Sequence, residues 1–421
     1  MYKCCDIEAL IELYPHAVIC LFRIIILAFA RSLGFAPQLC SSTLLALAVY
    51  MSGLTVLEKK QTQKRIAKEL GKVSHDALNR LPLRMMPFYR QCAQCIIRLI
   101  FLFSSEGWLI VDDFFVPKRY ANWIMGAYYH FDHTEGRCLV GHRLVVVLWT
   151  NGIIRIPIAF SMWHKKEYTT KYRSKNQIVR SLVYWVRKQN IPFAYLTFDN
   201  WYASKQNLRF FRKLEISFVT RLRKNTWLKW GDIKLTTHQL SQQQNISQYH
   251  YYRDLRAYVR SYVVNYPRFG EGLLAVVKND RHDEPGTTKF LFTSDLTLVN
   301  RQIVLRYRSR WTIEQFFKDC KQYLGLSACQ ARELYQVQFH IRVVFLTCMI
   351  SDLLKVDDAQ SLGDVQSNLR SLIIIKVGES QPVIAKISPE GNIVETTFKE
   401  LLSPIRTKLQ ITIGDEKPVI I

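Results

Sequence analysis

The sequence predicts an α/β fold, in which a mixed β-sheet is flanked by helices and preceded by a helical N-terminal domain. Two observations support this fold class. Residues 1–100 contain apolar and amphipathic runs of helical length, whereas strand-length apolar runs begin at Trp108. From Trp108 the segments follow the order three strands, helix, strand, helix and strand. That order is typical of a mixed sheet covered by helices.

Length and charge narrow the class of protein. The chain has 421 residues, enough for a large core and more than one domain. It is 49% hydrophobic and 22% charged, as expected of a globular rather than a disordered protein. Its formal net charge of +24 favours a polyanionic partner, because cationic side chains release counterions from such a partner on binding. Nucleic acid and an anionic membrane surface both fit.

Neither a membrane span nor a zinc site is predicted. The apolar run Ala17–Ala30 is shorter than the roughly 20 residues that cross a bilayer, and Arg23 lies in its middle. We therefore expect a buried helix there. Of the ten cysteines, only Cys92 and Cys95 have metal-like spacing, and packing within a helix explains that pair. Scattered unpaired cysteines suit a reducing cytoplasm.

The N-terminal hundred residues predict several short helices. The segments 41–54 and 55–72 are helical in pattern, with a turn at Gly71, and Ser74 is a suitable N-cap for a helix that Pro82 ends. Two short helices joined at a glycine, the first of them rich in lysine, fit a helix-turn-helix DNA reader. A helical bundle with a solvated basic face fits equally well.

The strand-like segments come next. The run Trp108–Phe115 ends in paired aspartates, and His142–Trp149 and Ile153–Trp163 are joined at Asn151-Gly152 as a hairpin. A helix over Lys175–Gln189 leads to the segment Phe193–Ser204. A second helix and the strand Ile216–Arg223 follow, and the segment from Asn225 to about Thr288 is predicted to be rich in strands and poor in helices.

The segment Tyr307–Leu326 is predicted to be one helix, because it contains no Pro or Gly before Gly325. At about 100° per residue, four of its polar residues fall within roughly 60° of one another on the helical wheel. These residues are Tyr307, Arg310, Glu314 and Lys321, with Lys318 close beside them. A solvated face with helical ion pairs would give the same pattern. A second long helix, buried along most of its length, is predicted over Leu334–Lys355.

Two aspartates follow strand-like runs far upstream of this helix. Asp112 closes WLIVD and Asp199 closes AYLTFD. Ligands of a mixed α/β sheet gather at strand ends, and an acidic side chain there is costly unless a cation or donor compensates it. A loop acid at Asp113 or a turn-initiating Asp199 would be the local alternative. Together with Glu314, the aspartates have the oxygen ligands that suit Mg²⁺, and paired ions can activate a water or hydroxyl against a phosphodiester.

The spacing Tyr-x2-Arg-x3-Glu-x6-Lys, followed by Gly-Leu, resembles the YREK signature of the DDE transposases of the insertion-sequence-four type. In that family the Glu is the third metal-binding carboxylate, and the Arg and Lys contact the transposon end. The segments VDDFFVPK and LTFDNWYAS resemble those around the family's first and second aspartates. Phe114 departs from the Thr of many members, and the doublet leaves the choice between Asp112 and Asp113 open, although the family pattern favours Asp112.

The resemblance implies a ribonuclease-H-like catalytic core and a transposase that cleaves DNA at the ends of its own element and joins them to a target. It implies Mg²⁺, for which Mn²⁺ substitutes, held by Asp112, Asp199 and Glu314. It also implies contacts with DNA, and the residues expected to make them are Tyr307, Arg310, Lys318, Lys321 and Lys118. The implied partner is double-stranded DNA, as terminal inverted repeats and as target, bound by a homodimer in the bacterial cytoplasm at the nucleoid. No membrane and no small-molecule substrate are expected.

Five segments follow from these patterns. They are a helical N-terminal domain (1–100), the first part of the catalytic core (101–223), a β-rich insertion (224–299), the core helices that complete the acidic triad (300–358), and a C-terminal region of unknown role (359–421). Two other functions stay open. One is a transposase-derived DNA-binding protein without catalytic activity, and the other is a basic protein of the membrane surface, based on Ala17–Ala30 and the net charge alone.

Overall fold

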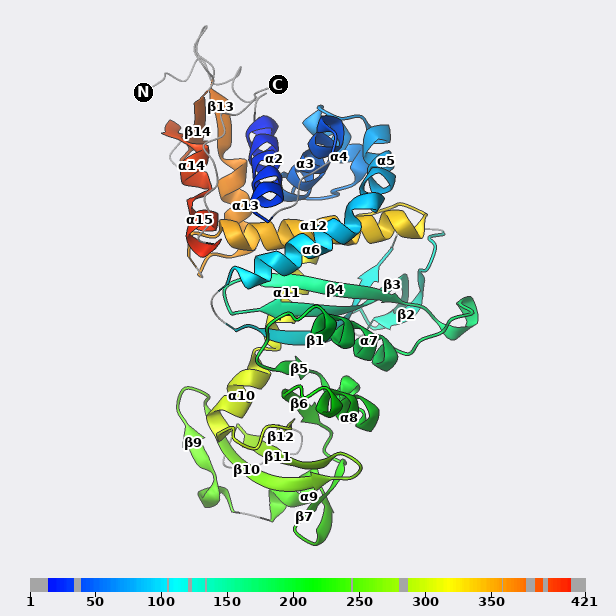
Figure 1. Cartoon of the computed structure of the whole chain (residues 1–421), viewed down its shortest axis with the longest axis vertical. Coiled ribbons are helices and arrows are strands. Elements are labelled where there is room, and N and C mark those ends of the chain that lie inside the picture. Colours follow the sequence, from blue (N-terminus) through cyan, green and yellow to red (C-terminus); the bar gives the residue numbers. More distant parts are fainter. Residues whose placement is uncertain are drawn as a thin grey trace.

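The chain is described by a computed structural model with three layers. Helices and a small sheet form the upper layer, a sheet with its helices forms the middle, and further strands form the lower lobe (Figure 1). The structure describes residues 14–33, 39–103, 106–119, 123–132, 135–243, 245–279, 287–357, 359–375, 383–388 and 393–409.

The described part of residues 1–100, which belongs to the upper layer, is helical as predicted. Its N-terminal helices are α2 (Tyr14–Ser32), α3 (Ser41–Val56), α4 (Gln63–Leu70), α5 (His75–Met85) and α6 (Tyr89–Phe101), with a short 3₁₀ turn at Met86–Phe88. The run Ala17–Ala30 lies within α2 and is mostly buried in the core, as expected. Gly71 has a φ of 67° and ends α4, and the Ser74 side chain caps α5.

Two details of this layer differ from the prediction. Lys59 and Lys60 precede α4 instead of lying on it. Pro82 lies inside α5 and does not end the helix. A proline in a helix interior loses one backbone hydrogen bond, but Leu81 and Met85 are buried against the core around it, and this packing outweighs the loss.

The middle layer contains the predicted strands and one more. Its strands are β1 (Trp108–Pro117), β2 (Tyr128–Asp132), β3 (Arg137–Thr150), β4 (Arg155–Trp163), β5 (Leu196–Phe198) and β6 (Phe218–Leu222). β1 pairs antiparallel with β3 and parallel with β5, and β5 pairs parallel with β6. The helices α7 (Lys175–Lys188) and α8 (Lys205–Lys213) connect β4 to β5 and β5 to β6. The sheet is therefore mixed, and the edge strand β2 is the element that sequence reasoning missed.

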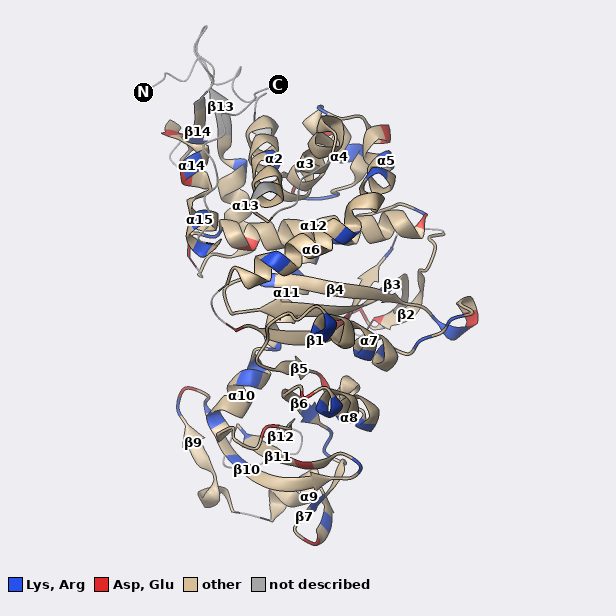
Figure 2. Cartoon of the chain, in the orientation of Figure 1, with Lys and Arg blue, Asp and Glu red and all other residues tan. Residues whose placement is uncertain are grey.

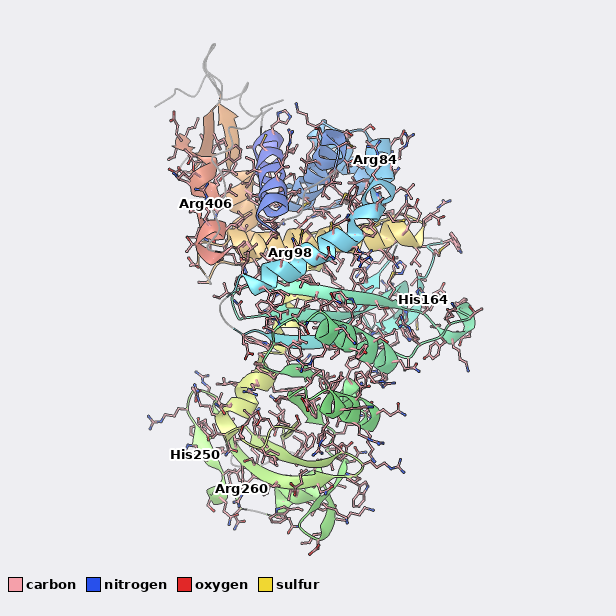
Figure 3. The ribbon with its side chains drawn as sticks, viewed as in Figure 1. Arg84, Arg98, His164, His250, Arg260 and Arg406 are labelled. Atoms are coloured by element: carbon pink, nitrogen blue, oxygen red, sulfur yellow. The ribbon has the colours of Figure 1, made fainter. Side chains whose placement is uncertain are left out.

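The predicted β-rich segment extends this sheet. Its elements are β7 (Trp227–Trp230), β8 (Ile233–Thr236), α9 (Thr237–Gln242), β9 (His250–Tyr252), β10 (Ala257–Tyr266), β11 (Gly270–Lys278) and β12 (Lys289–Thr293). β12 pairs with β6, so β10 and β11 continue the core sheet into the lower lobe (Figure 1). His250 and Arg260 lie in that lobe, far from Arg84 and Arg98 in the upper helices (Figure 3). The segment is therefore not a sheet of its own, and α9 gives it one short helix.

The segment 307–326 consists of parts of two helices, so the prediction of one continuous helix is wrong. α10 (Asn300–Arg308) is followed by α11 (Trp311–Gln322). At the junction, the Arg310 and Thr312 amides donate to carbonyls three residues earlier. The Ser309 hydroxyl donates to the Arg306 carbonyl at 2.7 Å and contacts the Tyr195 hydroxyl at 3.1 Å. A serine that bonds back to the preceding turn bends a helix without any Pro or Gly.

The helix α12 (Leu334–Leu354) crosses the molecule between the upper helices and the sheet (Figure 1). Among the described helices it is the one with the length and apolar composition of a membrane span, and 83% of its most apolar window is buried. Its His340 is fully buried, with Nδ1 2.7 Å from the Tyr50 hydroxyl of α3 and Nε2 3.1 Å from the Gly325 carbonyl. Gly325 has a φ of 61° and follows the end of α11, as predicted. His340 therefore ties the N-terminal helices to the end of α11.

The C-terminal elements complete the upper layer. They are α13 (Leu362–Arg370), β13 (Leu372–Ile375), β14 (Val383–Ile387), β15 (Ile393–Thr396), α14 (Phe398–Leu401) and α15 (Ser403–Leu409). The three strands form a separate antiparallel sheet, and β13 contacts α2. α13 and α15 pack on α12.

Candidate active site

Asp112 and Asp199 lie side by side in the sheet. The parallel pairing of β1 with β5 ends at Val111 and Phe198, and each aspartate is the next residue of the chain: Asp112 within β1, and Asp199 just after β5. Neighbouring strands are about 4.8 Å apart, so the two side chains leave the sheet at the same level. β1 itself does not end at Asp112 as predicted, because its pairing with β3 continues to Pro117. The pairing with β5 does end here, at Val111, the residue before Asp112.

Arg310 brings the third carboxylate to this place. Its Nη1 donates to Asp112 Oδ2 at 2.9 Å, and its Nη2 donates to Glu314 Oε1. Arg310 occupies the junction between α10 and α11, and Glu314 lies in the first turn of α11. The guanidinium also lies 5.9 Å from the centre of the Tyr307 ring. The kink thus places one cation between a carboxylate of the sheet and a carboxylate of the helix.

The electrostatics of Asp112 indicate a site that needs a cation. Burial raises the pKa of Asp112 to about 7, Arg310 opposes that rise, and the charges of Asp113 and Asp199 add to it. The electrostatic effect of Asp199 on Asp112 agrees with their adjacent positions in the sheet. A buried cluster of like charges is stable in ionised form only with a compensating positive charge.

Asp113 has a different environment from Asp112. Its Oδ2 accepts from Arg143 Nη1 at 2.8 Å and from Lys175 Nζ at 2.9 Å, and its Oδ1 accepts from the Tyr202 hydroxyl at 2.8 Å. Burial alone would raise the pKa of Asp113, but Lys175 and Arg143 outweigh burial and lower it. Three side chains, two of them cations, hold Asp113, whereas Asp112 accepts from one side chain, Arg310, and from the Asp113 amide. A metal ion at Asp112 would displace one ion pair and at Asp113 two, so Asp112 is the better candidate for a metal ligand.

The donor set suits a hard divalent cation in its chemistry. Carboxylate oxygens are the ligands that Mg²⁺ prefers in proteins, and the Arg310 guanidinium shows that the space between Asp112 and Glu314 accepts a positive charge. Within the described ranges, no group of three His, Cys, Asp or Glu side chains is close enough to hold one metal ion. The arrangement therefore has Arg310 as the cation of the cluster, and a metal ion would require the guanidinium to move.

Further along α11, the same face of the helix packs on β1. Phe317 stacks on Phe114 with ring centres 4.3 Å apart, and Lys321 Nζ lies 4.5 Å from the centre of the Phe114 ring. Both phenylalanines are buried. The phenylalanine that departs from the family pattern is thus part of the contact that seats α11 on the sheet.

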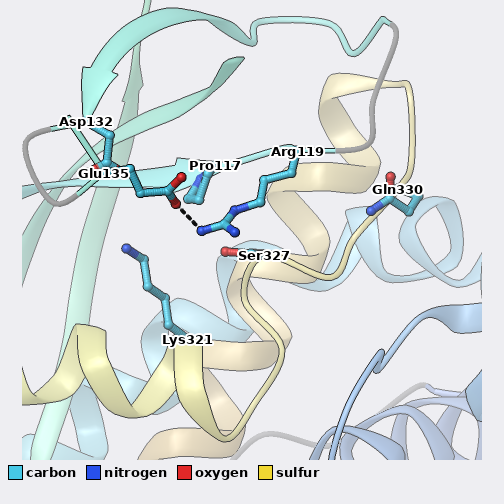
Figure 4. Close-up of a pocket in the computed structure, with 7 residues that line it drawn as sticks. All are labelled: Pro117, Arg119, Asp132, Glu135, Lys321, Ser327 and Gln330. Carbon is cyan, nitrogen blue, oxygen red and sulfur yellow. Dashed lines mark hydrogen bonds and ion pairs between the residues drawn. The ribbon is translucent and has the colours of Figure 1, made fainter. Parts of the chain in front are cut away.

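A polar cavity lies at the Lys321 end of this face. It has a volume of about 360 Å³ and is lined by Pro117, Arg119, Asp132, Glu135, Lys321, Ser327 and Gln330. Lys321 points into it, and Arg119 is paired with Glu135 (Figure 4). Lys321 is therefore accessible, two helical turns from Glu314.

The other predicted DNA-contact residues differ in exposure. Lys318 is exposed on α11, and Tyr307 is half-buried on α10. Lys118 is 2% exposed, and its Nζ donates to the Cys329 carbonyl at 3.0 Å. This burial contradicts the expected DNA contact of Lys118, which instead anchors the chain after α11. Lys and Arg residues are also part of α7, α8 and α10, the helices beside the sheet (Figure 2).

Sequence reasoning missed Arg143 and Lys175 as neighbours of the carboxylates. Arg143 reaches Asp113 because β3 runs antiparallel to β1 with Phe115 opposite Arg143, and this register is not readable from one sequence. Lys175 is the first residue of α7, behind a capping box of Ser174 and Gln177. The Ser-x-x-Gln spacing was a usable signal for the start of this helix, but not for its position beside β1.

Comparison with known families identifies the central part of the chain. The family model described as "Transposase DDE domain" matches residues 110–350, more than half of the 421 residues. A comparison with curated proteins gave no match. The matched range runs from β1 to α12 and includes Asp112, Asp199 and Glu314. The mixed sheet with flanking helices agrees with the predicted ribonuclease-H-like fold class. The chain therefore belongs to the transposase DDE domain family.

Proposed function

We propose that this transposase catalyses metal-dependent cleavage and strand transfer of DNA at the ends of its own insertion sequence, by a cut-and-paste route of the insertion-sequence-four type. One observation carries the proposal. Asp112 and Asp199 directly follow the last paired residues of the parallel strands β1 and β5, and Arg310 joins Asp112 to Glu314. These three carboxylates are the ones that the YREK resemblance assigns to metal.

The proposed metal chemistry fits phosphodiester cleavage. When bound, Mg²⁺ or Mn²⁺ supplies the Lewis acid that activates a water or 3′-hydroxyl and stabilises the leaving oxygen. The chain's own part is to hold Asp112 and Asp199 where the pairing of β1 with β5 ends, and to bring Glu314 of α11 near Asp112 through Arg310. Water access stays open at Glu314, whose side chain is 32% exposed.

The basic residues of α10 and α11 would bind the DNA end. Arg310 has a planar guanidinium suited to bidentate contact with a phosphate, and a phosphate at the carboxylates would draw it away from Asp112. Lys318 and Lys321 are exposed on the same helix and would grip neighbouring phosphates. Tyr307 packs near the guanidinium and would orient it.

The remaining roles follow from charge and architecture. The net charge of +24 supports double-stranded DNA as the partner, both as terminal repeats and as target. The helices α4 and α5, joined at Gly71, would serve as a DNA-binding element. We further propose a homodimer on paired ends, acting in the bacterial cytoplasm.

Conservative changes of two carboxylates test this function. With DNA from the regions that flank the coding sequence, Asp199→Asn and Glu314→Gln should bind as the wild type does and should not cleave in Mg²⁺. Each change removes a charge and keeps the shape. A variant that still nicks this DNA at the wild-type rate would refute the triad.

The metal dependence of cleavage distinguishes an active transposase from a DNA-binding protein that is derived from one. Cleavage should occur with Mg²⁺ or Mn²⁺ and stop with Ca²⁺ or a chelator, because Ca²⁺ prefers looser and higher coordination. Full activity in chelator would exclude the mechanism. Wild-type protein that binds this DNA but never cleaves it, with any metal, would instead be a DNA-binding protein derived from a transposase.

A further inference from the structure

Asp199 lies just beyond the strand that carries it. β5 is three residues long, and its last pairs in the sheet are Phe198 with Val111 and Phe198 with Thr220. The backbone after Phe198 leaves the sheet in a 3₁₀ turn, Asn200–Tyr202, for which Asp199 is the N-cap. Sheet pairing and the Thr220 hydroxyl hold Phe198, but the pairing does not include Asp199 itself, so contacts of the turn that follows help to set where its carboxylate lies.

The far end of that turn is fixed by Tyr202. Tyr202 is fully buried, and its amide donates to the Asp199 carbonyl at 3.0 Å. Its own carbonyl accepts from Asn207 Nδ2 at 3.0 Å. Its hydroxyl donates to Asp113 Oδ1 at 2.8 Å. The turn is thus tied to α8 through its backbone and to β1 through the phenol.

Asp113 is in turn held by two cations from other elements. Arg143 belongs to β3, and Lys175 is the first residue of α7. Both donate to Oδ2 within 2.9 Å, and the Asp113 side chain is 11% exposed. A carboxylate bonded on both oxygens by three side chains cannot turn toward a ligand without breaking two ion pairs. Its position is therefore fixed by β3 and α7, and the Tyr202 hydroxyl meets a fixed acceptor.

We propose that Asp113 and Tyr202 are positioning residues, which hold the turn at Asp199 against β1 so that Asp199 stays beside Asp112. The proposal rests on the proposed function, in which Asp112 and Asp199 bind the same metal cluster. It assigns the two members of the aspartate doublet different tasks. Asp112 is a ligand, and Asp113 sets the place of the second ligand without touching metal or DNA.

The variant Tyr202→Phe tests this proposal with little disturbance of packing, because it removes one hydroxyl and keeps the buried ring. On end DNA, the Mn²⁺ concentration for half-maximal cleavage should rise about tenfold, which corresponds to one lost hydrogen bond to a charged acceptor. The rate at saturating Mn²⁺ and the DNA affinity should stay near wild type. Direct Mn²⁺ binding to the protein–DNA complex, measured by electron paramagnetic resonance, should weaken by the same factor.

The control is Tyr262→Phe, which removes a buried tyrosine hydroxyl in the lower lobe, where its partner is Tyr249. This variant should keep the wild-type Mn²⁺ dependence.

Asp113→Asn should weaken Mn²⁺ binding at least as much as Tyr202→Phe, because the neutral amide loses both ion pairs. Unchanged Mn²⁺ affinity in Tyr202→Phe would overturn the proposal, and so would a lower maximal rate with unchanged Mn²⁺ dependence. If Asp199→Asn still cleaves, the proposed function fails. If Asp199→Asn is inactive and Tyr202→Phe behaves as wild type, only the positioning role fails.

Discussion

Replacing Arg310 by alanine should allow Mn²⁺ to bind the protein in the absence of DNA. In the free protein, the guanidinium bridges Asp112 Oδ2 and Glu314 Oε1. A metal ion that uses both carboxylates must displace it. We expect the wild type to bind Mn²⁺ weakly until a DNA phosphate engages Arg310, and the variant to bind it without DNA.

The expected increase in Mn²⁺ affinity follows from the contacts of Arg310 that a metal ion would break in the wild type. Arg310 makes two charge-assisted hydrogen bonds, and its side chain is 17% exposed. Each such bond contributes about 1.5 kcal/mol net, at the lower end of the usual range. Losing both costs about 3 kcal/mol, which is roughly a hundredfold in the dissociation constant of Mn²⁺.

Protonation of Asp112 opposes the higher Mn²⁺ affinity expected of Arg310→Ala. The pKa of Asp112 is about 7 with Arg310 present, and Arg310 lowers it. Without Arg310 the pKa rises further, so protons compete with Mn²⁺ at neutral pH. The gain in affinity should therefore be larger at pH 8.5 than at pH 7.

The assay is a Mn²⁺ titration of DNA-free protein, followed by electron paramagnetic resonance of the unbound ion at both pH values. Lys318→Ala is the matched control, because it removes an exposed positive charge from the same helix without touching the carboxylates. If wild-type protein binds Mn²⁺ as tightly as Arg310→Ala at pH 8.5, the guanidinium does not compete with metal. On saturating DNA, single-turnover cleavage by Arg310→Ala should be slower by about a hundredfold or more, because the phosphate clamp is lost.

Three further predictions concern stability and DNA binding. Asp112→Asn should stabilise the protein at pH 8 by at most about 4 kcal/mol, measured as a rise in the urea midpoint. The pKa of Asp112 in the folded protein, about 7, exceeds the ordinary 3.8, so the contribution of Asp112 to stability falls as pH rises between these two values. Burial and the Lys118 charge lower the pKa of His340 from 6.5 to about 3, so the contribution of His340 to the free energy of unfolding should fall by about 4 to 5 kcal/mol between pH 6.5 and 3. His340→Gln should remove this contribution, which is measured as the difference between the pH profiles of the variant and the wild type. Replacing Lys64 and Lys68 on α4 by alanine should weaken DNA binding and reduce the salt slope by about 0.9 per lost phosphate contact, with single-turnover cleavage on saturating DNA unchanged; an unaltered slope would argue against a DNA contact by α4.

The sequence predicted the elements of the core sheet but not all of their neighbours. β1, β3, β4, β5 and β6 and the helices α7 and α8 were expected from apolar runs, a hairpin signal and helix patterns. The edge strand β2 was missed because it has only five residues, some of them polar, which alternate between half-buried and exposed positions. The strands of the lower lobe were expected, but their union with the core depends on the pairing of β12 with β6, a contact between segments about seventy residues apart in the sequence.

The candidate site was predictable in its acids and less so in its cations. Asp112, Asp199 and Glu314 stood out because acids follow apolar strands or lie on a signature helix. The kink at Ser309 was not readable, because it depends on a hydroxyl that bonds to Arg306 and to Tyr195, and no Pro or Gly marks it. The buried position of Lys118 was equally hidden, since its partner is a backbone carbonyl beyond α11.

The alternation of a β-strand explains how one aspartate doublet serves two purposes. Successive side chains of β1 point to opposite faces, so Asp112 faces Arg310 and Asp113 faces Arg143 and Lys175. The cations of Asp113 come from β3 and from the start of α7, both regular secondary structure, and their two ion pairs keep the carboxylate ionised and in place. The cation of Asp112 comes from the junction between two helices, where a long side chain can exchange one anion for another. Arg310 therefore compensates part of the charge of the site before DNA arrives, and it is itself a residue that a phosphate attracts.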